Sequence, residues 1–189
     1  MTASDESPRH GFASLSRHAA IYGCASGALG GAWMMAEYAL GFGTERIDIG
    51  RYTQLASLVI PVAATVLGVM RWRDNACGGA FRFPQAFGAA LGIGLAFSAT
   101  MAAAAWFYSA VINPQIIPAI LDAQAAGMAA AGATPEDVTR TREEALLRAT
   151  PGALAYSVFV FSIIKSFVIA LMAAVSVRKK PLDPGPTPA

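Results

Sequence analysis

The chain has 189 residues, of which 55% are hydrophobic and only 14% are charged, with a net charge of +2 and a mean hydropathy of +0.48. Soluble domains carry roughly 25% charged residues, so this composition argues against a water-soluble protein. No basic cluster interleaved with aromatic residues is present, and nucleic-acid binding therefore has no support.

Four long apolar blocks follow one another along the chain, at about residues 19–42, 52–72, 84–112 and 151–177. A bilayer core requires roughly 20 apolar residues in a helix. The charges inside the blocks are Glu37, Lys165 and, at the end of the second block, Arg71. The sequence therefore predicts an all-α polytopic membrane protein, a four-transmembrane-helix bundle within residues 18–180.

The flanking segments predict which side each end occupies. With the N-terminus in the cytoplasm, the inside segments hold eight basic and four acidic residues, and the outside segments hold five basic and seven acidic. Basic residues favour the cytoplasmic side, so both termini are expected there. Residues 1–17 and 181–189 are expected to be disordered. The first block could alternatively be a cleaved signal peptide, although it is long for one and contains Glu37.

The segment between the third and fourth blocks predicts an extramembrane helical hairpin over residues 114–149. Thr134 and Pro135 followed by two acids are typical of a helix start. Glu136–Arg140 and Glu144–Arg148 have the spacing of stabilising ion pairs. Two interpretations remain open: a module that contacts a partner or lipid, or a cap that only packs on the bundle.

Glu37 and Lys165 are the charges that lie well inside the predicted spans. A charge at mid-membrane costs roughly 2.5–3.5 kcal/mol, so both side chains should face the bundle interior or a cavity. They could form a structural pair or an ion or proton site. Ser162 lies three residues before Lys165 in an S-x-x-K spelling, but the sequence shows no oxyanion donor for hydrolysis.

Small residues recur on two of the predicted spans. Gly23, Gly27 and Gly31 form a stripe on the first, and Gly88 and Gly92 repeat the spacing on the third. Such glycines let helix backbones approach closely. The stripes could pack the first and third spans together or form an oligomer interface. Pro61, in the middle of the second span, is expected to kink it.

The remaining reactive residue types predict no cofactor or metal site. Cys24 lies inside an apolar block and Cys77 in a loop expected in the cytoplasm, so a disulfide is not expected. His10 and His18 lie in or near the N-terminal segment and are expected to be solvated or interfacial.

Several segments, taken in order, resemble the DUF4199 family, a bacterial family of unknown function. They are the stretch RWRDNACGGAFRFPQAF with Gly78, Gly79, Phe83 and Phe87, then Trp106, Tyr108 and VINPQIIPAIL, then the acidic helix and the last span. The resemblance covers about residues 19–180. It implies four spans in the bacterial inner membrane with an outward helical insert, and it implies no activity. Lys165 departs from the family pattern, which leaves a shared role for that position in doubt.

Three functions compete on this sequence. The favoured hypothesis is a non-enzymatic bundle that acts as an assembly or accessory component, with the lipid bilayer and either a second copy or another membrane protein as partners. The alternative is a small transporter or channel that uses Glu37 and Lys165. An intramembrane enzyme is the weakest hypothesis, because no acid–base or metal constellation is visible.

Overall fold

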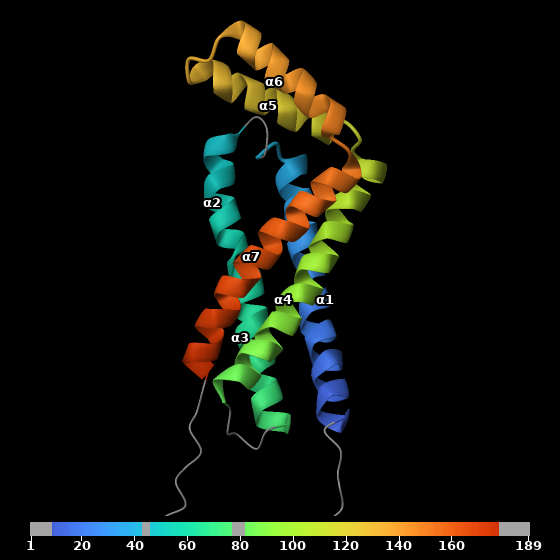
Figure 1. The fold of residues 1–189 in the computed structure, drawn as a ribbon, viewed down its shortest axis with the longest axis vertical. Coiled ribbons are helices and arrows are strands. Elements are labelled where there is room, and N and C mark those ends of the chain that lie inside the picture. Colours follow the sequence, from blue (N-terminus) through green and yellow to red (C-terminus); the bar gives the residue numbers. More distant parts are fainter. Residues whose placement is uncertain (1–8, 43–45, 77–81, 178–189) are drawn as a thin grey trace, which may run out of the picture.

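The structure is a computed structural model that describes residues 9–42, 46–76 and 82–177, and every regular element in these ranges is helical. The helices that run along the bundle are α1 (Arg9–Ala39), α2 (Ile47–Ser57), α3 (Val59–Ala76), α4 (Phe83–Phe107) and α7 (Pro151–Val177). A π-helical turn, η1 (Tyr108–Ile112), extends α4. Two further helices, α5 (Ile116–Ala130) and α6 (Pro135–Arg148), lie side by side across one end (Figure 1).

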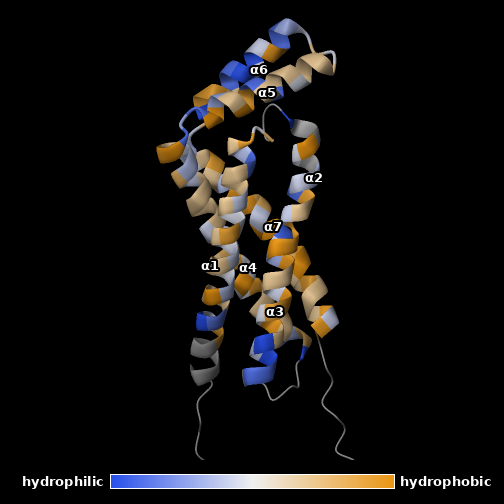
Figure 2. Cartoon of the chain, turned by 180° about the vertical axis from the view of Figure 1, so that it is seen from behind, coloured by the Kyte–Doolittle hydropathy of each residue, from blue (hydrophilic) through white to orange (hydrophobic). Residues whose placement is uncertain are grey.

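The chain passes along the bundle four times, with α2 and α3 together making the second pass (Figure 1). The start of α1 and the end of α7 lie at the same end, opposite α5 and α6. Among the described residues, three helical segments are long and apolar enough to cross a membrane: Tyr52–Asn75, Phe83–Ile112 and Pro151–Val177. Figure 2 shows hydrophobic residues along these segments and hydrophilic ones on α6.

The first predicted span does not qualify as a crossing segment by composition. Helix α1 has 31 residues, which is long enough, but its glycine and serine residues lower its mean hydropathy. Residues 9–17, which we expected to be disordered, form its first turns. Leu15 packs against the buried core, and this contact accounts for the longer helix. Residues 1–8 and 178–189 lie outside the described residues.

The second predicted span is broken at Leu58, between α2 and α3. Pro61 explains the break, because proline has no N–H to donate to the carbonyl of Ser57 and its ring crowds that carbonyl. The N–H of Leu58 instead donates to the Leu55 carbonyl at 3.1 Å. The kink expected from Pro61 is therefore present, three residues before the proline itself.

The core lies at the end of the bundle where α1 begins. Small and branched side chains from α3, α4 and α7 meet there, including Val69, Ala90 and Ala174, which are fully buried. Arg73 is also buried at this end, and its guanidinium donates to the carbonyl of Val177 at 3.5 Å and to Asp74 at 2.7 Å. A cation at the last carbonyl of α7 complements the helix dipole.

Helices α5 and α6 begin and end close to where the sequence places them. The hydroxyl of Thr134 caps α6 by accepting from the N–H of Asp137 at 3.2 Å. Gly132, in the turn between the helices, has a φ of 88°, a conformation that glycine adopts without strain. Arg140 pairs with Asp137, three residues before it, at 3.0 Å rather than with Glu136 as the sequence predicted. Arg142 pairs with Asp122 of α5 at 2.6 Å.

Candidate functional site

A cavity of about 600 Å³ occupies the half of the bundle nearer to α5 and α6. Helices α1, α2, α4 and α7 form its walls, and Gln124 reaches it from α5. Towards the packed core, Ser166 of α7 lies against Gly94 of α4, and its hydroxyl donates to the Gly94 carbonyl at 3.5 Å. This close crossing of α4 and α7 lies just beyond Lys165 and separates the cavity from the core.

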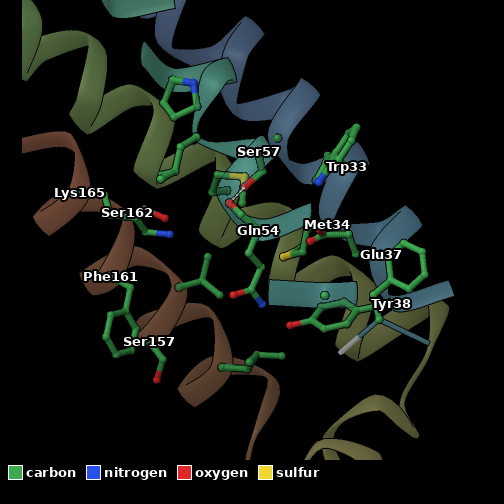
Figure 3. A pocket seen from close by; sticks show the side chains of 18 of the residues that line it. Trp33, Met34, Glu37, Tyr38, Gln54, Ser57, Ser157, Phe161, Ser162 and Lys165 are labelled. Carbon is green, nitrogen blue, oxygen red and sulfur yellow. Dashed lines mark hydrogen bonds between the residues drawn. The ribbon is translucent and has the colours of Figure 1, made fainter. Parts of the chain in front are cut away.

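Helix α1 contributes the acidic wall. Its lining residues recur at helical spacing on one face and include Trp33, Met34, Glu37 and Tyr38. Figure 3 shows Glu37 and Tyr38 directed towards the cavity. The Oε1 atom of Glu37 is buried and has no hydrogen-bond partner among the described residues. A buried carboxyl oxygen without a partner is costly, so this atom requires a proton, a water molecule or a ligand group.

Tyr38 is held in place by the π-helical turn. Its ring stacks on Tyr108 of η1, with the ring centroids 5.6 Å apart. The amide of Asn113 in turn donates to the hydroxyl of Tyr108 at 3.2 Å. Single π-helical turns of this kind are frequent at functional sites. No sequence pattern predicts this turn, because residues 108–112 have the pattern of an ordinary helix end.

Helix α7 contributes the basic wall. Ser157, Phe161, Ser162 and Lys165 lie on one face of the helix and line the cavity. Figure 3 shows Ser162 and Lys165 on the side of the cavity opposite Glu37 and Tyr38. Ser162 is buried, whereas Lys165 is exposed at the edge of the cavity. The spacing of Ser162 and Lys165, three residues apart, was a signal that the sequence already contained.

Helix α2 and the start of α3 form the third wall through Gln54, Ser57 and Pro61. The hydroxyl of Ser57 donates to the carbonyl of Gln54 at 2.7 Å, next to the break. Gly50 anchors the other end of α2, because a Cβ there would overlap the carbonyl of Phe42. Sequence reasoning missed Gln54 and Gln124 as site residues, since glutamine alone carries no helical-face signal.

The two charged residues singled out from the sequence are thus brought to one cavity. They are not joined directly, since the ion pairs of the described residues connect Arg73 with Asp74, Arg140 with Asp137, and Arg142 with Asp122. Ser162 and Lys165 also both line the cavity, and no hydrogen bond within the described part of the chain connects them. The arrangement offers a carboxylate and an ammonium group on opposite walls.

The glycine stripes lie mainly inside the bundle, on the α1–α4 contact. A Cβ on Gly23 would overlap Ala96 and the Ile93 carbonyl. One on Gly27 would lie 2.6 Å from the Cβ of Thr100, and one on Gly31 would lie 2.7 Å from that of Ala104. Gly92 faces Ala19 at 3.2 Å, whereas Gly88 has open space around it. The stripe on α1 is therefore covered by α4 of the same chain.

His18 and Cys24 do not line the cavity. His18 stacks on Tyr22 with centroids 5.0 Å apart, outside the cavity, and Cys24 is a free, exposed thiol. Cys77 lies outside the described residues, as does the side chain of His10. No group of three or more histidine, cysteine or acidic side chains that could hold a metal occurs in the described ranges.

Comparison with known protein families gives one result. A family model described as a protein of unknown function, DUF4199, matches residues 21–179. The chain belongs to the DUF4199 family. No curated protein and no solved structure matches it.

The part of the chain matched to DUF4199 contains every residue that lines the cavity, from Gly30 to Lys165. It also contains the segment RWRD, in which Arg73 binds the end of α7. The cavity lies within the DUF4199 region, as does the packed core apart from Ala19 and Leu15 of α1.

Proposed function

We propose that this DUF4199 protein crosses the membrane four times, with α1 as the fourth spanning helix. Its 31 residues extend about 46 Å, which exceeds the thickness of a bilayer core. It runs beside α4 for much of its length, and its outward side chains include Ile21 and Leu29, the latter 59% exposed. Buried glycines lower its hydropathy without making its outer surface polar.

We place the protein in the bacterial inner membrane with both termini in the cytoplasm, where Arg71, Arg73 and Arg82 also lie. These arginines are near the end of the bundle at which α1 begins. Basic residues are retained on the cytoplasmic side of a membrane. Helices α5 and α6, with exposed charges such as Glu136 and Arg140, then form an extramembrane hairpin on the opposite side.

The function we propose is non-enzymatic: the cavity binds a small molecule that carries both a cationic and an anionic group, as the binding step of a transport component. The supporting observation is the unpartnered Oε1 of Glu37, which lies across the cavity from Lys165. An uncompensated charge in the interior of a membrane costs about 2.5–3.5 kcal/mol. A ligand with both charges would compensate Glu37 and Lys165 together. The volume of about 600 Å³ is within the range of small-molecule sites.

The assembly role that the sequence favours has less support in this geometry. The stripe of Gly23, Gly27 and Gly31 is occupied by α4 and is not available to a second copy or another membrane protein. The remaining surface for such a partner is the pair of helices α5 and α6. We therefore place ligand binding first and assembly second.

Neutralising the two charges tests the binding proposal. We expect Glu37→Gln and Lys165→Met to weaken binding of a zwitterion by about tenfold or more, the effect of removing one charge of a desolvated pair. Lys165→Arg should retain most of it. The probes are glycine, phosphoethanolamine and a zwitterionic phospholipid, titrated against the protein in nanodiscs and followed by thermal shift.

Ser176→Ala is the matched control, because Ser176 lies on nearly the same face of α7 as Lys165, three turns away and outside the cavity. If none of the three probes binds, or if the charge-neutral variants bind as the unchanged protein does, the proposed function is wrong.

A further inference from the structure

The cavity opens through the side of the bundle. Several of its lining residues are exposed on the flank between α2 and α7, among them Gln54, Lys165 and Phe161, the last 66% exposed. Helix α2 makes its main contacts with α1 and α3 rather than with α7. The break at Leu58 lets α2 lean away from α7, and Figure 1 shows the two helices diverging above this point.

The opening lies at the depth of the hydrocarbon core. Lys165 is 14 residues from the start of α7, about 21 Å along a helix of about 40 Å. Gln54, on the other side of the opening, belongs to the apolar segment Tyr52–Asn75. A side opening at this depth faces acyl chains, so a molecule that enters through it must itself be dissolved in the bilayer.

The lining has the composition expected for an amphipathic ligand. Apolar side chains dominate it, with Met34, Phe97 and Phe161 among them, and the charged residues in the described part of the lining are Glu37 and Lys165. Lys165 is exposed at the mouth, where an ammonium group facing hydrocarbon requires an anion. The buried Oε1 of Glu37 lies further inside and requires a cation or another donor.

We propose that the ligand is a zwitterionic phospholipid with a primary ammonium group, which enters sideways between α2 and α7. Its phosphate meets Lys165, its ammonium group meets Glu37, and its acyl chains remain in the bilayer. This inference rests on the proposed function and names the ligand class of the same cavity. A free zwitterion would meet the same two charges but would have to arrive from water past α5, where Gln124 lines the cavity.

Photo-crosslinking tests the lateral site directly. The probe is phosphatidylethanolamine with a diazirine on its headgroup, diluted into nanodiscs of phosphatidylglycerol that contain the full chain. We expect crosslinks at cavity residues halfway along the spans, such as Phe97, Phe161 and Ser162. Crosslinks confined to residues at the ends of the spans would overturn the proposal, because they would place headgroups only at the membrane surface.

Variants separate a specific site from general lipid contact. Glu37→Gln and Lys165→Met should each reduce the mid-span crosslinks by about tenfold or more, while Lys165→Arg and Ser176→Ala should preserve them. Folding of each variant is checked by thermal unfolding. Equal crosslinking in Lys165→Met and the unchanged protein, with both folded, would overturn the assignment of the phosphate to Lys165.

Competition separates this inference from the proposed function. Unlabelled phosphatidylethanolamine should displace the probe, whereas soluble phosphoethanolamine should not. If phosphoethanolamine or glycine binds in a manner that depends on Glu37 and Lys165 while the lipid does not, the lipid assignment is wrong and the proposed function stands. If neither the lipid nor the soluble molecules bind, both are wrong.

Discussion

Single glycine residues determine how closely α1 approaches α4. Gly27 is the clearest example, since a Cβ at this position would lie 2.6 Å from the Cβ of Thr100 and 2.9 Å from the Phe97 carbonyl. Both neighbours are on α4, and one of them is backbone that cannot rotate away. The helices would have to separate to accept even a methyl group.

We therefore expect Gly27→Ala to destabilise the bundle by about 1–3 kcal/mol, the usual cost of overpacking a tight contact. Reversible unfolding in mixed detergent micelles measures this change. Gly88→Ala is the matched control, because nothing lies within 4 Å of a Cβ there, and alanine is the better helix former by up to about 1 kcal/mol. Equal destabilisation by both substitutions would contradict the close α1–α4 contact.

Single contacts also explain how Arg73 can be buried at the packed end of the bundle. Its guanidinium lies between the Asp74 carboxylate and the carbonyl of Val177, and so both its charge and its donors are partly satisfied. Arginine spreads its charge over a planar group and is less strongly hydrated than lysine, which suits this position.

At the scale of elements, the break between α2 and α3 shapes the cavity. Helix α2 positions Gln54 and Ser57, and it can lean outwards because Pro61 removes one helical hydrogen bond at Ser57. If α2 and α3 formed one continuous helix, α2 would follow the axis of α3, and Gln54 and Ser57 would occupy different positions relative to the cavity. The position of the α2 wall of the cavity therefore depends on Pro61, although its side chain is apolar.

We expect Pro61→Ala to straighten this pass, because the restored N–H at position 61 can donate to the Ser57 carbonyl. The mean distance between spin labels at positions 54 and 157 should change, and binding of the phospholipid probe should weaken. Pro84→Ala is the control: Pro84 lies in the first turn of α4, where a missing N–H has little cost. An unchanged distance distribution in Pro61→Ala would show that tertiary packing, not the proline, holds the break.

At the scale of the whole molecule, four passes bring the start of α1 and the end of α7 together and place α5 and α6 at the other end. The bundle is packed tightly near its first end, around Val69 and Ala90, and is hollow near the other. The exposed apolar side chains around it are typical of a membrane protein, since contiguous apolar surfaces of this kind are rare on soluble monomers.

Cysteine accessibility tests this arrangement in the membrane. In a background with Cys24 and Cys77 replaced by serine, cysteine is introduced at Glu136 on α6 or at Asn75 at the end of α3, both of which are exposed. We expect a membrane-impermeant maleimide to label position 136 only from outside and position 75 only from inside. Labelling of both positions from the same side would contradict the four-span topology.

The sequence by itself determined the helical class and three apolar helices that are long enough to cross a membrane, because sustained apolar runs without charge are compatible with few other structures. It also located α5, α6 and the ends of α7, through Thr134, Pro135 and Pro151, since capping and proline preferences act locally. The extent of α1 was predicted incorrectly, because Leu15 is ordered by a distant contact with the core rather than by its neighbours.

Only the tertiary structure showed that Glu37 and Lys165 line a common cavity. Glu37 and Lys165 were visible as costly charges, yet their spacing along the chain says nothing about whether they touch. The lean of α2 and the crossing of α4 and α7 at Gly94 and Ser166 hold the walls apart, which leaves a cavity where a direct pair was one expectation. The distance between the helices that carry Glu37 and Lys165 depends on packing at positions far from these two residues. A local sequence pattern does not encode such packing.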